Sequence, residues 1–233
     1  MAWSFFNPLL MLVIYTLVFS SIFKVRWGVG GGESKSHFAL ILFVGLILHG
    51  FFADCIIRAP NLVLANVSYV KRVVFPLELL PWVSVLSALF HLLISMVVLL
   101  VVQFALDIYL PATAILLPVL LLPFIFVTVA LSFIFAALGV YLRDIGQLTT
   151  MITTVLFFLS PIVYPVSSLP KQFQSWVMLS PITYPVNQAR RMLIFGELPQ
   201  LSGWFIYMTV AVVLLALSFF FYQEMRKGFA DVL

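Results

Sequence analysis

The sequence predicts an all-α integral membrane protein that crosses the bilayer six times. Hydrophobic residues make up 64% of its 233 residues and charged residues only 9%, whereas a soluble domain is about half apolar and about a quarter charged. The charged residues also lie mainly between apolar runs of about 20 residues, the length that a helix needs to cross the hydrocarbon core. The composition therefore excludes a disordered chain, a coiled coil and a conventional soluble enzyme.

Six apolar runs are expected to form the membrane spans. They cover residues 5–23, 38–57, 79–106, 111–142, 147–164 and 203–222. The first run is not expected to be a cleaved signal peptide, because no basic residue precedes it and no small-residue cleavage motif follows it. Residues 1–233 are therefore predicted to form a single transmembrane domain.

The segment 160–199, between the fifth and sixth spans, is too broken by proline for a seventh span. It contains Pro161, Pro165, Pro170, Pro181, Pro185 and Pro199. Proline blocks a continuous helix, and irregular backbone survives at membrane depth only under a cover of protein or beside a water-filled cavity. The pattern fits a re-entrant pair of short helices that dips back into one membrane face. It fits equally an ordinary surface loop with amphipathic helices.

The connection between the second and third spans carries two adjacent cations, Lys71 and Arg72, and reaches a proline at Pro76. Pro76 disfavours helical backbone at Phe75, so a short helix is expected to end there. This connection has two interpretations. It is either a loop that fixes the topology or a helix along the membrane surface that docks on a cytosolic partner.

An even number of spans places both termini on the same side of the membrane. The connections on that side carry Arg58, Lys71, Arg72, Arg143, Arg226 and Lys227, and those on the other side carry Lys24, Arg26, Lys35, Lys171, Arg190 and Arg191. Because the two sets are equal in size, the excess of basic residues that marks cytoplasmic loops does not decide the orientation. The cations are scattered singly or in pairs, so no nucleic-acid partner is expected.

Few side chains are candidates for chemistry. Asp54 and Arg58 have the i, i+4 spacing of an ion pair, and charges near a bilayer are functional candidates, although their place near the end of the second span favours a structural pair at the interface. His49 and His91 have no ligand-type neighbours, so we expect packing or cavity-lining roles. The sequence predicts no catalytic residues, no metal site and no phosphate-binding loop for nucleotide hydrolysis.

Aromatic residues make up 16% of the chain. Most are expected to face lipid or the protein core. Six of them flank or lie within the proline-rich segment: Phe157, Phe158, Tyr164, Phe173, Trp176 and Tyr184. Because sugar rings stack their apolar faces on aromatic rings, this cluster could guide a saccharide.

Three stretches in order along the chain carry a resemblance to a known family. The first runs from Trp3 through Asn7-Pro8 to Ser20, the second from Asn66 through Lys71-Arg72 to Phe75-Pro76, and the third joins Arg143-Asp144-Ile145 to Ser160-Pro161-Ile162-x-Tyr164-Pro165, Ser180-Pro181-x-x-Tyr184-Pro185, Arg190 and Gly196. They resemble the membrane subunit of ABC type-2 polysaccharide exporters, which move O-antigen, capsule or teichoic acid chains. In that family an amphipathic stretch usually precedes the first motif. We expect this chain either to lack that stretch or to begin too late to include it.

The resemblance implies a permease in the bacterial inner membrane, with both termini cytoplasmic and a pore between the two subunits of a homodimer. It implies that residues 67–75 form a coupling helix seated in a separate ATP-binding subunit, which binds ATP and Mg while this chain holds no cofactor. The coupling contacts would come from Ser68, Tyr69, Val70, Lys71, Arg72, Val73 and Phe75. It also implies that segment 160–199 is a re-entrant pair near the periplasmic pore exit.

The implied substrate is a polysaccharide on an undecaprenyl-diphosphate lipid. Its path would follow the six aromatic residues together with Arg190 and Arg191. Arg58, Arg190 or Arg191 would meet the diphosphate, since guanidinium groups bind phosphate oxygens in pairs. The alternatives are an exporter of the same architecture for a drug or another lipid and, more remotely, a membrane-embedded glycan-processing enzyme, for which the longest loop holds only one acid, Glu197.

Overall fold

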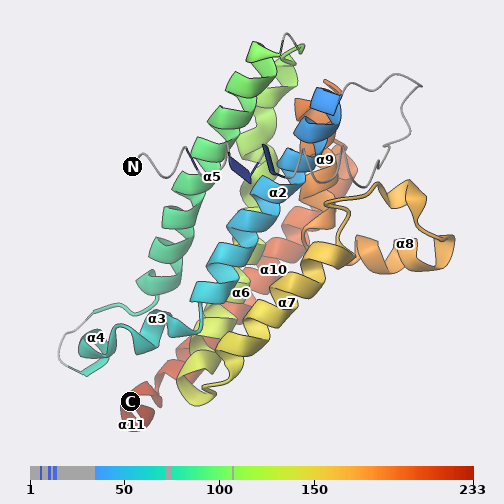
Figure 1. Cartoon of the computed structure of the whole chain (residues 1–233). Coiled ribbons are helices and arrows are strands. Elements are labelled where there is room, and N and C mark those ends of the chain that lie inside the picture. The colour runs from blue at the N-terminus through green and yellow to red at the C-terminus, as the bar shows by residue number, and fades with distance from the viewer. Residues whose placement is uncertain (1–5, 7–9, 12, 15–34, 72–74, 107) are drawn as a thin grey trace. The chain divides into compact units, whose positions relative to one another are not determined.

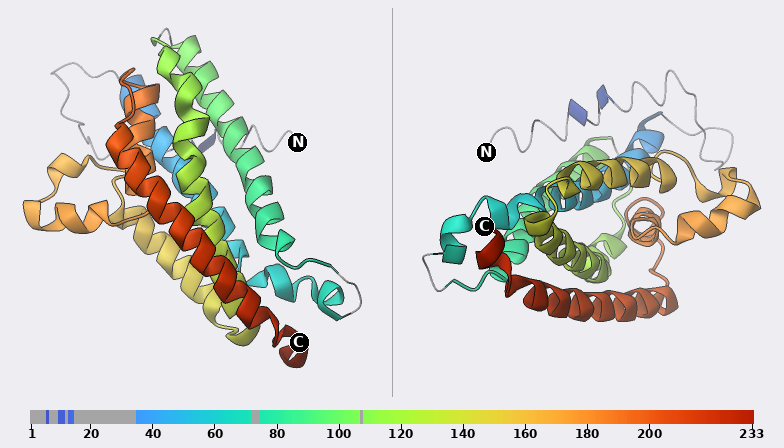
Figure 2. Two further views of the ribbon diagram at one scale, coloured as in Figure 1. Left: turned by 180° about the vertical axis from the view of Figure 1, so that it is seen from behind. Right: turned by 90° about the horizontal axis from the view of Figure 1, so that it is seen from below.

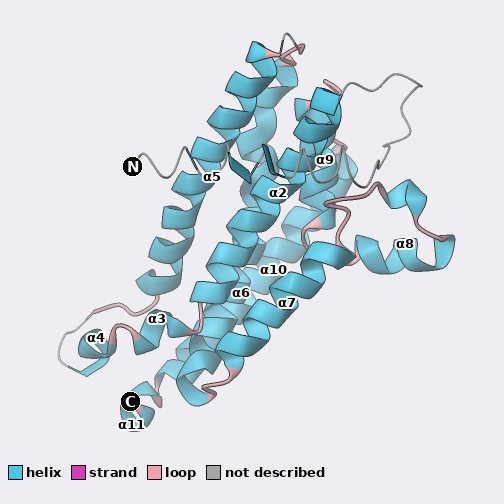
Figure 3. Cartoon of the chain, viewed as in Figure 1, coloured by secondary structure: helices cyan, strands magenta, loops and turns pink. Residues whose placement is uncertain are grey.

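The computed structural model describes residues 6, 10–11, 13–14, 35–71, 75–106 and 108–233. Every regular element within these residues is a helix, and no strand occurs among them (Figure 3). The all-α prediction is therefore confirmed for this part of the chain. Most of the predicted first span, residues 5–23, lies outside the described residues.

The elements follow one another from α2 to α11 (Figure 1). Their bounds are α2 Lys35–Arg58, α3 Asn61–Leu64, α4 Val67–Lys71, α5 Leu79–Ala105, η2 Ala112–Leu116, α6 Leu117–Tyr141, α7 Ile145–Leu159, η3 Val166–Ser168, α8 Lys171–Met178, α9 Thr183–Leu193, α10 Leu201–Arg226 and α11 Phe229–Val232. Both views in Figure 2 show α10 as one continuous helix.

Within the described residues, four stretches are long and apolar enough to cross a membrane: His37–Arg58, Leu79–Ala105, Ala112–Tyr141 and Leu201–Arg226. They coincide with the predicted second, third, fourth and sixth spans. The fifth predicted span is shorter in the structure, because α7 ends at Leu159 rather than near residue 164. Pro161 explains the early end, since a proline disfavours helical backbone at the residue before it.

The chain packs as two compact units, and α2, α5, α6 and α7 each contribute residues to both. The first unit comprises residues 1–50, 90–120 and 157–199. Its described core includes the fully buried Leu40 and Ile41 of α2, Ile162 of the turn after α7, and Val186 and Ala189 of α9. Both short helices of the proline-rich segment, α8 and α9, belong to this unit.

The second unit comprises residues 51–89, 121–156 and 200–233. Its core is aromatic: Phe52 stacks on Phe124, while Phe133 and Phe229 both contact the ring of Tyr222. These five side chains are fully buried. The unit also carries α3, α4 and α11, so the expected coupling segment and the chain's C-terminal helix are parts of one packed body.

A glycine permits a close backbone approach in the second unit. A Cβ added at Gly139 of α6 would lie 2.2 Å from the carbonyl oxygen of Pro60, in the turn between α2 and α3. Glycine lacks a side chain, so it alone lets α6 pass this close to the backbone of the turn. Gly146 of α7 has no neighbouring atom within 4 Å of the same added atom.

We expect Gly139→Ala to destabilise the protein by about 1–3 kcal/mol, because the added methyl forces the Pro60 turn away from α6. The measurement is thermal unfolding of the detergent-purified chain. Gly146→Ala is the matched control and should leave the melting temperature unchanged or raise it slightly, since alanine is the better helix former. Equal melting temperatures for the two variants would contradict the close contact.

Candidate functional site

The expected coupling helix is short. Helix α4 ends at Lys71, residues 72–74 lie outside the described part, and Phe75 is not helical. The Phe75 ring instead stacks on that of Tyr69, with centroids 4.8 Å apart. Ser68 and Tyr69 are exposed, while the side chains of Val70, Lys71, Arg72 and Val73 are not among those described. The coupling role of all seven residues stays a prediction.

Two neighbouring helices contact α4. Helix α3 precedes it in the same connection, and α11 approaches it from the C-terminal end of the chain (Figure 1). Phe229 of α11 is fully buried between Tyr141 and Tyr222. The exposed face of α4 is therefore presented from a packed base rather than from a free loop.

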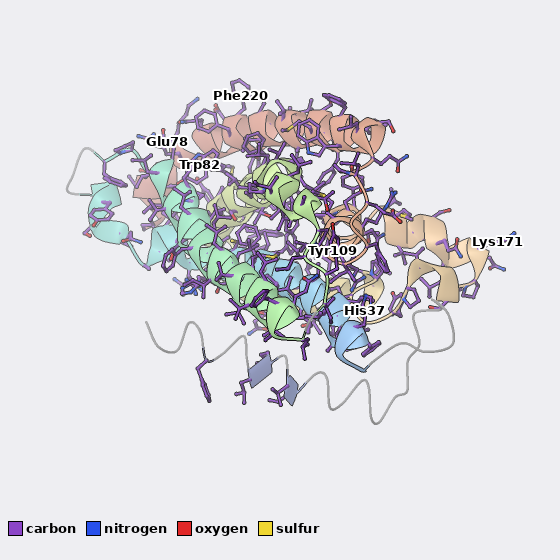
Figure 4. The ribbon with its side chains drawn as sticks, turned by 90° about the horizontal axis from the view of Figure 1, so that it is seen from above. His37, Glu78, Trp82, Tyr109, Lys171 and Phe220 are labelled. Carbon is purple, nitrogen blue, oxygen red and sulfur yellow. The ribbon has the colours of Figure 1, made fainter. Side chains whose placement is uncertain are left out.

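The segment after α4 is fastened to α10 by three hydrogen bonds. The hydroxyl of Tyr222 donates to the carbonyl of Leu77 at 3.1 Å. One carboxylate oxygen of Glu78, Oε1, accepts from Nε2 of Gln223 at 2.6 Å and from the guanidinium of Arg226. Figure 4 labels Glu78 just before α5, with Trp82 one turn further along. This joins residues 77–78 to the last turns of the final span.

These contacts control the charge of Glu78. Burial alone would raise the pKa of its carboxyl, but a hydrogen bond from its own backbone, the Gln223 amide and the Arg226 guanidinium together outweigh burial. The pKa therefore lies below the ordinary 4.5, and the carboxylate is charged at neutral pH.

Sequence reasoning did not identify the Glu78 cluster. The available signal was position, because Glu78 immediately precedes the third predicted span and Arg226 lies four residues beyond the sixth. With an even number of spans, these two residues are expected at the same membrane face. Their pairing across 148 positions in sequence follows only from the packing of α10.

In the first unit, Arg190 joins three elements. Its guanidinium donates to the carbonyl of Ile41 in α2 at 2.9 Å, of Pro161 at 2.5 Å and of Ile162 at 2.6 Å. The side chain is buried. Gly45 makes room for it, since a Cβ there would lie 2.7 Å from one guanidinium nitrogen. Arg190 thus connects α9, α2 and the turn after α7.

The C-terminal end of α9 is held by two further side chains. The amide of Gln103 donates to the carbonyls of Leu193 at 3.0 Å and Tyr109 at 2.8 Å. The hydroxyl of Thr113 donates to the carbonyl of Met192 at 2.7 Å. These donors satisfy carbonyl groups that a helix end leaves without intrahelical partners. Helix α9 is therefore fixed along its last turn.

The predicted aromatic cluster divides into packed and exposed members. Phe157 contacts His49 and Phe158, with ring centroids 5.1 Å apart in each pair. The hydroxyl of Tyr164 donates to the end of α7, lying 2.7 Å from the carbonyl oxygen of Phe158. Tyr184 is partly buried in α9.

Three members of the cluster are exposed, and two of them lie on helix α8. The third, Phe158 of α7, is 65% exposed. On α8, Phe173 is 57% exposed and Trp176 is 66% exposed, and Lys171 projects at the outer end of the helix (Figure 4). Val177 is the buried residue of this helix. The exposed rings are free to meet a ligand, although the saccharide-guiding role of the six aromatic residues stays a prediction.

The remaining candidate charges form ion pairs. Arg58 and Asp54 are 2.8 Å apart, and their side chains are 52% and 34% exposed. Arg191 pairs with Glu197 at 2.7 Å on an exposed surface. Throughout residues 35–71, 75–106 and 108–233, no three His, Cys, Asp or Glu side chains gather as a metal site.

Comparisons with known proteins give a consistent result. A family model described as "ABC-2 type transporter" matches residues 1–194. An "O-antigen export system permease protein RfbA" from Myxococcus xanthus is 26% identical over 98% of this chain and 86% of its own length. Two proteins of the same name from Klebsiella pneumoniae are 23% and 22% identical, each over 99% of this chain and 86% of its own length.

Replacing Arg190 should destabilise the protein far more than replacing its neighbour. Arg190→Met leaves three carbonyl groups without their donor, so we expect a loss of about 3 kcal/mol or more. Arg191→Met removes an exposed ion pair worth at most about 1 kcal/mol. Thermal unfolding of both variants in detergent measures the difference. Equal losses of stability would show that the three hydrogen bonds of Arg190 do not stabilise the protein.

The Glu78 carboxylate should make stability depend on pH. Because its folded-state pKa is below the ordinary 4.5, its contribution is present above pH 4.5 and is lost as the pH falls through the folded value. We expect Glu78→Gln to have a lower melting temperature than the natural chain at pH 7. The gap should narrow as the pH is lowered below 4.5. A gap that stays constant with pH would exclude a contribution from the ionised carboxylate.

Proposed function

The chain belongs to the ABC-2 type transporter family, and we propose that it is the permease of an ATP-driven exporter of a lipid-linked O-antigen or similar surface polysaccharide. The observation that supports this most strongly is the similarity to O-antigen export permeases over nearly the whole chain. The four long apolar helices fit a multi-pass protein of the bacterial inner membrane.

The proposed architecture has six spans, with both termini in the cytoplasm and a pore between two copies of the chain. Residues 5–23 supply the first span, and α7 supplies the fifth together with the turn that follows it. The two short helices α8 and α9 form the re-entrant pair near the periplasmic exit. Their separation by proline and their length support this assignment over a single further span.

A separate ATP-binding subunit supplies the energy. It holds ATP and Mg, docks on α4, and moves this helix as its nucleotide sites close and open. The permease carries no catalytic residue and contributes the path and its selectivity. The exposed Ser68 and Tyr69, on a base packed against α3 and α11, support docking at this surface.

The proposed substrate is a polysaccharide on undecaprenyl diphosphate. The exposed rings of Phe173 and Trp176 offer stacking surfaces for sugar rings. Among the three candidate arginines, Arg58 and Arg191 keep partly exposed guanidinium groups for the diphosphate. Arg190 already donates to three backbone carbonyls, so of the three arginines it is the least available to bind the diphosphate.

Affinity purification of the tagged chain from its native membrane, combined with deletion of its gene, tests the proposed function. We expect an ATP-binding subunit to co-purify in equal amount, and the deletion to remove a polysaccharide from the cell surface while the glycan accumulates inside. Increased drug sensitivity with a normal surface glycan would instead indicate a drug exporter. Recovery of the chain without an ATP-binding subunit would contradict the proposal.

Reversing the two cations of the coupling segment should block export without blocking membrane insertion. We expect Lys71→Glu with Arg72→Glu to abolish surface display of the glycan, because acidic side chains replace the basic ones offered to the partner or to lipid headgroups. Immunodetection in the membrane fraction reports insertion. Lys171→Glu, a single exposed change on α8, is the control and should export normally. Normal display in the double variant would refute the coupling assignment.

A further inference from the structure

We propose that Glu78, held by Gln223 and Arg226, links the coupling segment to the C-terminal helix α10, so that movement of α4 displaces α5 and α10 together. This inference rests on the proposed function and deepens it by naming the residues through which the partner's motion is passed on. Glu78 is a positioning residue, since it acts through the helices that it joins.

The connection that carries α4 is held near both of its ends. At its start, Pro60 lies against Gly139 of α6, with no space for an added methyl group. At its end, Leu77 and Glu78 are bonded to α10 through Tyr222, Gln223 and the Arg226 guanidinium. A displacement of α4 can therefore be passed on at two attachment points of the described chain, one on each side of this helix.

The second of these points has the properties of a firm joint. The Glu78 side chain is 19% exposed and that of Arg226 37% exposed, so their bond is partly shielded from competing water. Its oxygen Oε1 accepts two hydrogen bonds, one of them charge-assisted, and such bonds are roughly twice as strong as neutral ones. Tyr222, which holds the adjacent carbonyl, is fully buried.

The C-terminal end of α10 is packed closely enough to pass on a displacement of Glu78. The Tyr222 ring packs edge-on against Phe133 and Phe229. The hydroxyl of Tyr141 donates to the carbonyl of Met225 at 2.7 Å. A Cβ at Gly228 would meet that hydroxyl at 2.5 Å, which shows how closely the chain turns here before α11. Helix α11 in turn contacts α4, so the joint closes into a ring of contacts.

Without the Glu78 joint, α4 would still pull on α5 through the chain itself. Helix α10 would then follow only through the Tyr222–Leu77 hydrogen bond and apolar contacts. The expected defect is therefore incomplete coupling: the partner continues to hydrolyse ATP, but less substrate is exported for each ATP. Residues that carry coupling between sites change it by roughly twofold to thirtyfold when altered.

The test reconstitutes the permease and its ATP-binding subunit in lipid vesicles and measures ATP hydrolysis and glycan export in parallel. For Glu78→Gln and Arg226→Met we expect hydrolysis to be retained and export per ATP to fall roughly threefold to tenfold. The exchange variant Glu78→Arg with Arg226→Glu should recover most of the loss, because the Gln223 amide can present either its donor or its acceptor.

The matched controls lie beside the joint. Glu224 and Lys227 form an ion pair at 2.6 Å with side chains 73% and 72% exposed, and both lie at the C-terminal end of α10. Glu224→Gln and Lys227→Met should leave export per ATP unchanged. If a single variant at Glu78 or Arg226 fails to assemble, export per ATP is compared between the natural chain, Arg226→Lys and the exchange variant. Arg226→Lys keeps one charged donor.

Two results would overturn the inference. Unchanged export per ATP in assembled Glu78→Gln and Arg226→Met complexes would show that the joint is structural only. An exchange variant that assembles but stays as defective as the single variants would show that the pairing itself is not the link. Both results leave the proposed function intact, whereas failure of the natural chain to hold any ATP-binding subunit removes the proposed function itself.

Discussion

Hydrogen bonding of backbone carbonyls at helix ends is the constraint on which this structure depends. The last carbonyls of a helix have no intrahelical partners, and a bilayer offers no water to replace them. This chain interrupts its helices often, and side-chain donors meet the resulting carbonyls. Thr183 donates to the end of α8 and Tyr141 to the end of α10. Where the donor comes from a distant helix, the same bond that satisfies a carbonyl also joins two elements.

Arg190 is the clearest example of a donor that satisfies backbone carbonyls and joins distant segments. Pro161 ends α7 early, and the irregular backbone that follows exposes the carbonyls of Pro161 and Ile162. One guanidinium satisfies both and also reaches Ile41, within the helical stretch of α2. That reach requires a glycine at position 45, because a methyl group there would collide with the arginine. A proline, an arginine and a glycine distant in sequence therefore form a single structural unit.

The sequence predicts the long elements well and the joints between them poorly. Apolar runs bounded by charges locate α2, α5, α6 and α10, because a helix in lipid must be apolar along its length. Proline spacing correctly indicates two short helices in segment 160–199. It does not indicate that Arg190 is buried while adjacent Arg191 pairs on the surface, since both are single cations in the same stretch. The contacts of Gly139 and Glu78 are equally hidden, because their partners come from other parts of the chain.

These joints bear on how such a protein can move. Breaking the hydrogen bonds of helix-end carbonyls inside a bilayer costs free energy. Helices therefore move most easily when each helix end and its side-chain donor move together. In the second unit the carbonyls of Leu77 and Met225 each accept from a tyrosine hydroxyl, and these bonds can persist while the helices shift as a body. In the first unit, α9 is fixed by donors from α5 and η2, while α8 exposes its aromatic rings. Helices that move without breaking their backbone bonds and an exposed surface that can meet a ligand are both features that the proposed export needs.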